Sequence, residues 1–357
     1  MSQTANKRQP WLDILRTLAI AGVVLCHSVE GVYAFDVNSI QALSSMSRVF
    51  AIAMYSLGRV LGVPLFLMLT GYLLLDREYD TKGCVTFWKK NWLQLFLCTE
   101  AWIVLYELFL LLYQKQPIPL GYLIRAMLFL EPSSMYHMWY MPMLLGFYGL
   151  IPLAAIALQK VDVKVLLVPF LVYFAYGYGV AFYAQLAPVA GYPAPANQFS
   201  QGFGGGVYGL YIVSGYLLKK DFFVKIKRWG WALVVAVSFA VMVGVQYYTY
   251  GKGIAAGVWY DSPLVYVCAV GIWNLVSGCR EKIKAYPVPM LLSRYSFGVF
   301  LMHMIVRCVA LPELLGLGIG AACKLIVVWT VLFAGGFLLS FFVARIPKIG
   351  KYLLLVK

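Results

Sequence analysis

A long apolar segment begins the chain with Trp11-Leu-Asp13-Ile-Leu-Arg16-Thr-Leu-Ala-Ile-Ala-Gly-Val-Val-Leu-Cys-His27, and three of its side chains are ionisable. Ionisable groups at membrane depth are costly and commonly mark functional sites. A step of eleven residues turns a helix about 20° past three full turns, so Arg16 and His27 share one face of a predicted helix. They lie about 16 Å apart along its axis, which places a cation near one membrane surface and an imidazole toward the other.

The composition places the whole chain in a lipid bilayer. Hydrophobic residues make up 62% of the 357 residues and charged residues only 12%, whereas a soluble domain has roughly 25% charged residues. Runs near 20 apolar residues recur along the chain, as transmembrane helices require. We therefore predict an all-α, polytopic integral membrane protein, a single domain over residues 1–357, with about ten spans at 11–34, 50–75, 87–113, 137–158, 165–187, 203–218, 229–250, 259–278, 291–311 and 320–344.

The net charge of +15 follows the predicted topology. With the N-terminus in the cytoplasm, most of the 29 Lys and Arg residues fall on inside loops and ends. This positive-inside bias predicts that both termini are cytoplasmic, and it explains the basic composition without a nucleic-acid partner. Six basic residues remain outside: Arg48, Lys115, Arg125, Lys252, Arg307 and Lys324.

Neither the cysteines nor the histidines suggest a metal site. Seven cysteines, an odd number, are scattered without a Cys-x-x-Cys pair, which favours reduced packing residues. The three histidines, His27, His137 and His303, are far apart in sequence and not at close ligand spacing. We expect no metal and no permanently bound cofactor.

Two interpretations remain open for each end of the first span. Arg16 either snorkels and pairs with Asp13 three residues earlier, or binds a phosphorylated ligand through its planar fork of donors. His27 is either a neutral imidazole bonded inside the bundle or a general base that takes a proton from a hydroxyl. Glu30, one turn further, either orients that imidazole or is an interfacial anion.

Arg59 in the second span has no acidic neighbour within one turn, so its partner must come from another helix, from backbone carbonyls or from a ligand. Glu100 and Glu107 lie seven residues apart, on one face of the third span. We expect an ion pair between Arg59 and one of them; a proton relay or a substrate contact is the alternative.

Polar and aromatic residues also mark two later spans. His137 and Trp139 open the fourth span, and His303 lies inside the ninth. Trp139 is also explained by the aromatic belt at a membrane surface. The residues alone give His137 and His303 no definite role.

Four segments, in the same order, are similar to motifs of acyltransferase family 3, the integral-membrane O-acyltransferases of bacteria. The first is an arginine and a histidine separated by ten residues, here Arg16 and His27. The others resemble a second-helix signature, a fourth-helix entry and a penultimate-helix signature: Arg59-Val-Leu-Gly-Val-Pro64-Leu-Phe-Leu-Met-Leu-Thr-Gly71-Tyr72, His137-Met-Trp139-Tyr140-Met-Pro142 and Tyr295-Ser296-Phe-Gly298-Val-Phe-Leu-Met-His303. The resemblance spans nearly the whole chain and agrees with the family's ten-helix core.

The resemblance implies transfer of an acyl group, usually acetyl from cytoplasmic acetyl-CoA, to a hydroxyl of an extracytoplasmic sugar or polymer. By position, His27 would be the catalytic base, Arg16 its partner on the donor side, and Arg59 a residue that binds donor or substrate. Further candidates for binding donor or substrate are Asp13, Glu100, Glu107, His137, Trp139 and His303. The chain is similar to the stand-alone, polysaccharide-modifying branch, in the bacterial cytoplasmic membrane. Expected partners are acyl-CoA, a sugar or lipid-linked glycan and membrane lipid, and a homo-oligomer is left open.

A transporter is the alternative function. The same family includes membrane domains that move small solutes such as amino acids, and polar groups inside ten helices suit that role as well. Inverted repeats of broken helices would favour transport, and no such repeat is detected in the sequence.

Overall fold

The computed structural model describes residues 8–195, 206–223, 226–254 and 258–356, and no strand occurs among them. Eight helical segments are long and apolar enough to cross a membrane. Each overlaps one predicted span, which confirms the all-α, multi-pass fold. The eight are Pro10–Tyr33, Ser45–Leu74, Thr81–Gln114, Tyr136–Gln159, Val163–Ala190, Arg228–Gly251, Pro287–Leu315 and Ala321–Val343.

The other two predicted spans correspond to shorter helices. α11 covers Gly206–Lys219 (14 residues) and α13 covers Pro263–Ser277 (15 residues). At 1.5 Å per residue each is about 21–23 Å long, less than the ~30 Å hydrocarbon core. Residues 203–205 of the sixth predicted span lie outside the described residues.

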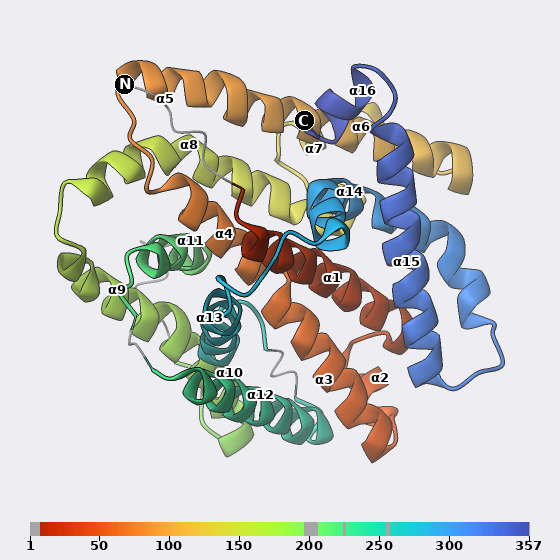
Figure 1. The fold of residues 1–357 in the computed structure, drawn as a ribbon. Helices are drawn as coiled ribbons and strands as arrows, with labels where there is room; N and C mark the ends of the chain where they lie inside the picture. The colour runs from red at the N-terminus through yellow and green to blue at the C-terminus, as the bar shows by residue number, and fades with distance from the viewer. Residues whose placement is uncertain (1–7, 196–205, 224–225, 255–257, 357) are drawn as a thin grey trace.

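α1 (Pro10–Tyr33) runs through the centre of the bundle (Figure 1). It packs against α3 (Ser45–Leu61), α4 (Val63–Leu74), α14 (Pro287–Leu315) and α15 (Ala321–Val343). Gly22 and Gly58 permit the close approach of α1 and α3, because a Cβ on Gly22 would lie 2.6 Å from that of Leu61. Small residues commonly let membrane helices approach in this way. The helix that carries Arg16 and His27 is therefore held on several sides.

The second predicted span is broken into two helices. α3 ends at Leu61, Gly62 has non-helical backbone angles, and α4 begins at Val63. Pro64 explains the break, since in a continuous helix it has no N–H to donate to the carbonyl of Val60 and its ring would clash with that carbonyl. The break lies three residues after Arg59, next to the candidate site.

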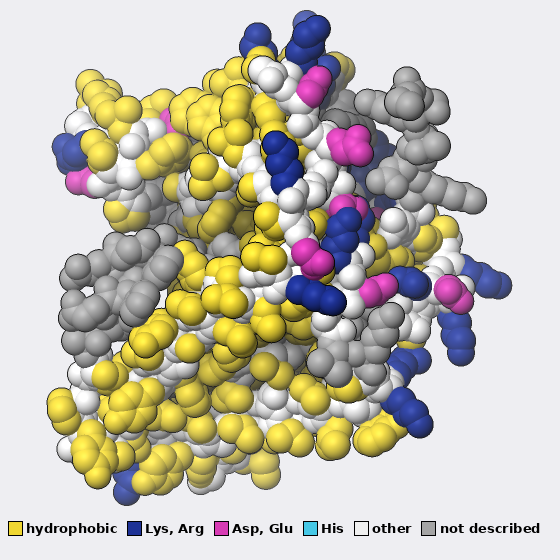
Figure 2. Space-filling model, turned by 90° about the vertical axis from the view of Figure 1, so that its left-hand side faces the viewer, with side chains coloured by type: hydrophobic (Ala, Val, Ile, Leu, Met, Phe, Trp, Pro, Cys, Tyr) yellow, Lys and Arg dark blue, Asp and Glu magenta, His cyan; other side chains and the backbone are white. Residues whose placement is uncertain are grey.

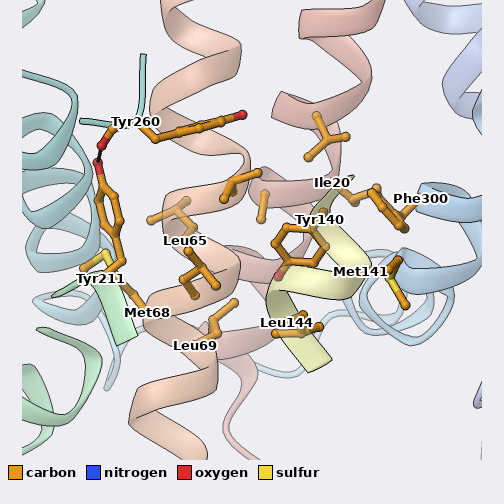
Figure 3. Close-up of a cluster of buried hydrophobic side chains, with 14 of the residues drawn as sticks. Ile20, Leu65, Met68, Leu69, Tyr140, Met141, Leu144, Tyr211, Tyr260 and Phe300 are labelled. Carbon is orange, nitrogen blue, oxygen red and sulfur yellow. Dashed lines mark hydrogen bonds between the residues drawn. The ribbon is translucent and has the colours of Figure 1, made fainter. Parts of the chain in front are cut away.

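A buried apolar cluster joins α4 to its neighbours (Figure 3). Leu65, Met68 and Leu69 of α4 line one side of it. The hydroxyl of Tyr211 on α11 donates to the carbonyl of Tyr260 at 2.9 Å. This bond fixes the loop before α13, which carries aromatic residues of the candidate site.

The remaining helices surround this centre, and the face in Figure 2 is broadly hydrophobic, with most of its charged side chains on the right-hand side. Such a surface suits contact with lipid tails. The short helix α7 lies between the third and fourth predicted spans. The other bounds are α2 Val37–Ala42, α5 Thr81–Phe87, α6 Leu93–Gln114, α7 Leu120–Met127, α8 Tyr140–Gln159, α9 Leu167–Tyr173, α10 Val180–Leu186, α12 Arg228–Gly251 and α16 Ile349–Leu353.

Candidate active site

His27, Glu30 and Tyr136 form a hydrogen-bonded group on the central helix. Oε2 of Glu30 lies 2.9 Å from Nδ1 of His27. Because a carboxylate accepts hydrogen bonds, Nδ1 carries the proton and Nε2 keeps its lone pair. The hydroxyl of Tyr136 donates to the same carboxylate oxygen at 2.7 Å and lies 3.0 Å from Nδ1. The imidazole is thus oriented with a basic nitrogen left over, and 12% of its side chain is exposed.

Arg59 reaches the same carboxylate from α3. Its guanidinium lies 3.7 Å from the ring centroid of Trp259 and donates to the hydroxyl of Tyr55. That hydroxyl in turn donates to Oε1 of Glu30 at 3.0 Å, and a guanidinium nitrogen lies 3.7 Å from Oε1. Nε of Arg59 is buried without a hydrogen-bond partner among the described residues. Glu30 therefore links His27 to Arg59, whose Nε is still free to donate a hydrogen bond.

The expected ion pair between Arg59 and Glu100 or Glu107 is wrong. Glu107 is buried and accepts a hydrogen bond from Tyr122 at 3.3 Å. Glu100 is partly exposed, and its buried Oε1 has no partner within the described chain. The reason is helix packing: α3 packs against α1, whereas α6 packs against α7, α8 and α16. The carboxylate nearest to Arg59 therefore comes from α1.

The fold brings the three histidines together from three helical elements. Ring centroids are 5.2 Å apart for His27 and His303, 5.3 Å for His137 and His303, and 6.2 Å for His27 and His137. His137 and His303 are completely buried or nearly so. Among the described residues, however, no group of three His, Cys, Asp or Glu side chains is arranged to hold a metal ion.

The hydrogen bonds of the two buried histidines assign their protons. Nδ1 of His303 lies 3.0 Å from the carbonyl of Val299, so it donates and Nε2 is a lone pair. The hydroxyl of Tyr106 donates to the carbonyl of Leu301 at 2.5 Å, so it accepts from Nε2 of His137 at 3.4 Å. In the described structure, Nε2 of His303 and Nδ1 of His137 have no hydrogen-bond partner. Nε2 of His303 is therefore left as an acceptor beside His27.

Trp139 lies at the edge of the site rather than in its centre. It ends the 3₁₀ turn Tyr136–Trp139 that precedes α8. Its ring centroid is 6.4 Å from that of Trp259, the residue that covers Arg59. Tyr136 and Trp139 also line a cavity of about 280 Å³ bounded by α6, α7 and the loop before the turn.

Arg16 and Asp13 lie at the opposite end of α1. Asp13 is buried and is bonded by Ser293 of α14 at 2.7 Å and by Arg8 at 2.8 Å. Arg16 makes a longer contact of 3.5 Å with Asp13, and 30% of its side chain is exposed. Arg16 forms no other hydrogen bond within the described chain. The local pair is therefore present, and it leaves most of the arginine's donors open.

Four residues in or beside the site were not predicted from the sequence: Tyr55, Tyr136, Trp259 and Arg307. Helical spacing could have indicated two of them, since Tyr55 precedes Arg59 by one turn and Arg307 follows His303 by one turn. Tyr136 directly precedes His137. Each was hidden because aromatic residues and outside charges have ordinary explanations in membrane proteins.

A family model described as an acyltransferase domain matches residues 9–345. The match includes every candidate site residue named above. The chain belongs to acyltransferase family 3. The sequence resemblance is confirmed at this level, and the protein is a multi-pass membrane acyltransferase. No curated protein and no solved structure matches the chain.

Proposed function

We propose that this acyltransferase moves an acyl group, in the first place the acetyl group of cytoplasmic acetyl-CoA, to a hydroxyl of a cell-surface sugar or glycan precursor. The proposal places it in the bacterial cytoplasmic membrane, with the stand-alone, polysaccharide-modifying branch of its family. One observation carries it: the bond between Glu30 and Nδ1 of His27, which leaves Nε2 as a base. In unrelated acyl-transfer enzymes a carboxylate orients an imidazole in the same way, and the free nitrogen of that imidazole activates a nucleophilic hydroxyl. Here the nucleophile would be the hydroxyl of the acceptor.

In the proposed reaction, Nε2 of His27 takes the proton of the acceptor hydroxyl. The hydroxyl oxygen forms a bond to the thioester carbonyl carbon, and the carbon–sulfur bond then breaks. Coenzyme A leaves as a thiolate and receives the proton from Nε2. Glu30 stays ionised and stabilises the imidazolium that forms between the two steps.

Arg59 is suited to stabilise the negative charge that develops on the thioester oxygen. Its Nε is a buried donor with no partner in the described structure, and its guanidinium is held in place by Trp259 and Tyr55. Donors that are fixed before the reaction lower the barrier most, because they need no reorganisation.

The donor would enter from the Arg16 end of α1. Arg16 keeps most of its donors free, and Arg8 lies close by on Asp13. Planar guanidinium groups bind phosphate well. The rise from Arg16 to His27, about 16 Å in a continuous helix, is a distance that a pantetheine arm can span. The thioester would then reach His27 while the phosphates stay near the basic surface.

The test measures acetyl transfer by the full chain in lipid nanodiscs, with radiolabelled acetyl-CoA and a panel of sugars. We expect His27→Gln to lower transfer and coenzyme A release by at least about 100-fold, the usual contribution of a general base, without changing the Kd of acetyl-CoA. Undiminished transfer in the variant would contradict the proposal. Uptake of free solute into sealed vesicles, without acetyl-CoA binding, would favour a transporter.

A further inference from the structure

Arg307 lies beside the His27 group without a carboxylate partner of its own. It follows His303 by one turn of α14, and its Nε is 3.6 Å from the position that a Cβ on Gly31 would occupy. It interacts electrostatically with both Tyr136 and His303. Within residues 8–195, 206–223, 226–254 and 258–356, it forms no ion pair, and its buried Nε has no hydrogen-bond partner.

Three of the five other basic residues on the predicted outer side are bonded to the protein. Arg48 donates to the carbonyls of Ile40 and Leu43, each at 3.2 Å. Arg125 pairs with Glu131 at 2.9 Å. Lys324 donates to a backbone carbonyl at 2.6 Å. Arg307 differs from these three residues because its donors have no such partner.

The charges around the site do not balance. Arg59 and Arg307 contribute two positive charges and Glu30 one negative charge, and the three histidines cannot contribute a negative charge. A partly buried cation is costly unless an anion neutralises it. The missing negative charge is therefore expected on a ligand, and a guanidinium binds carboxylate and phosphate groups in particular.

We propose that Arg307 binds a carboxylate or phosphate group of the acceptor sugar, so that this acyltransferase modifies an anionic glycan. The inference rests on the proposed function. The anion belongs to the acceptor and not to coenzyme A, because Arg307 lies near Gly31 and His303 while Arg16 lies at the other end of α1. An anionic group there would also hold the acceptor hydroxyl near Nε2 of His27.

The experiment measures binding of three small sugars to the full chain in phosphatidylcholine nanodiscs, which carry no net charge. Glucuronate supplies a carboxylate, glucose 1-phosphate a phosphate, and glucose neither. We expect at least one anionic sugar to bind about tenfold or more tightly than glucose, and Arg307→Gln to remove that preference. Arg125→Gln is the matched control, with the same change on the same predicted side, and should keep it.

Equal binding of all three sugars, no binding of either anionic sugar at millimolar concentrations, or an unchanged preference in Arg307→Gln would overturn the proposal. If Arg307→Gln does not fold, Arg307→Lys is the second variant, because it keeps the charge and loses the planar guanidinium. It should weaken binding of the anionic sugars and leave binding of glucose unchanged. If Arg307→Gln lowers the melting temperature only in nanodiscs that contain phosphatidylglycerol, Arg307 binds lipid phosphate. That outcome also overturns the proposal.

Acetyl-CoA assays on the same samples separate the two proposals. A chain that transfers acetyl groups equally well to neutral and anionic sugars contradicts only the role of Arg307. A chain that binds anionic sugars through Arg307 but never releases coenzyme A contradicts only the proposed function.

Discussion

Nδ1 of His27 and the carboxylate of Glu30 lie 2.9 Å apart on adjacent turns of α1. The spacing of three residues makes this contact a property of the helix itself. Tyr136 and Tyr55 then come from other elements and donate to the two oxygens of the same carboxylate. A base whose orientation is fixed by three side chains loses little entropy when it reacts.

Replacing Glu30 by Gln should separate the charge of this residue from its shape. Glutamine keeps the size but no longer stabilises an imidazolium, and it can present its N–H₂ to Nδ1 and change the tautomer. We expect kcat for acetyl transfer to fall by about 10²–10⁴-fold. The measurement is coenzyme A release together with the Kd of acetyl-CoA, which should stay within about twofold.

Glu313→Gln is the control for this variant, since Glu313 is exposed near the end of α14. It should transfer acetyl groups like the unchanged protein. If Glu30→Gln and Glu313→Gln have equal rates, the carboxylate of Glu30 does not assist His27.

Arg16→Gln should affect the donor and not the chemical step. Arg16 lies at the opposite end of α1 from His27, and only one long contact to Asp13 occupies it in the described structure. Loss of a charged hydrogen bond to phosphate costs about 1.5–3 kcal/mol. We expect KM for acetyl-CoA to rise by at least about tenfold with kcat nearly unchanged. A large fall in kcat at saturating donor would instead indicate a role near the reacting atoms.

Most of the fold was predictable because eight of the predicted spans are apolar runs long enough for a bilayer. The break between α3 and α4 was not predicted, although Gly62 and Pro64 mark it in the sequence. Apolar residues on both sides satisfy the hydropathy pattern whether or not the helix is continuous, so composition alone does not reveal the break.

The candidate site was predicted only where its residues share one helix. Arg16, His27 and Glu30 follow from helical periodicity on α1. The partner of Arg59 was misassigned because the order in which helices pack is not contained in their hydrophobic pattern. The meeting of His27, His137 and His303 depends on the same packing, so their spacing in sequence concealed it.

Arg59→Lys should show whether the planar guanidinium is needed. Lysine keeps the positive charge near Glu30 but loses the flat stack on Trp259 and the donor at Nε. Removing one donor to a developing oxyanion commonly costs about 10²–10³-fold in kcat, and we expect at least tenfold here. Single-turnover rates of acetyl transfer test this, and a rate within about twofold of the unchanged protein would mean that charge alone suffices.

Asp76 should make stability depend on pH. Its carboxylate lies 2.6 Å from Nζ of Lys220 and 3.1 Å from Nζ of Lys219, just after the end of α4. Partial burial acts to raise the pKa of Asp76, but hydrogen bonds from Lys220 and Lys219 leave it below its ordinary value. A lowered pKa in the folded state gives stability that is present at neutral pH and is lost as the pH falls through that pKa.

The measurement for Asp76 is the melting temperature in detergent from pH 7 down to pH 3. Asp76→Asn should be less stable than the unchanged protein at pH 7, by up to about 1 kcal/mol. The difference should shrink as the pH falls below about 4, because the carboxyl is protonated first in the unfolded chain and, at a lower pH, in the folded protein. A difference that is constant with pH would show that the ion pairs do not contribute.

Gly215→Ala should destabilise the crossing of α4 and α11. A Cβ at Gly215 would overlap the backbone carbonyl of Met68, and one at Gly71 would overlap that of Ile212. Backbone cannot move aside as a side chain can, so we expect a loss of about 1–3 kcal/mol in the free energy of unfolding and a melting temperature lower by several degrees.

Gly146→Ala is the matched control, because a Cβ there would meet no atom within 4 Å. It should be neutral or slightly stabilising, since alanine favours a helix over glycine. Equal melting temperatures for Gly215→Ala and Gly146→Ala would mean that α4 and α11 do not cross as closely as described here.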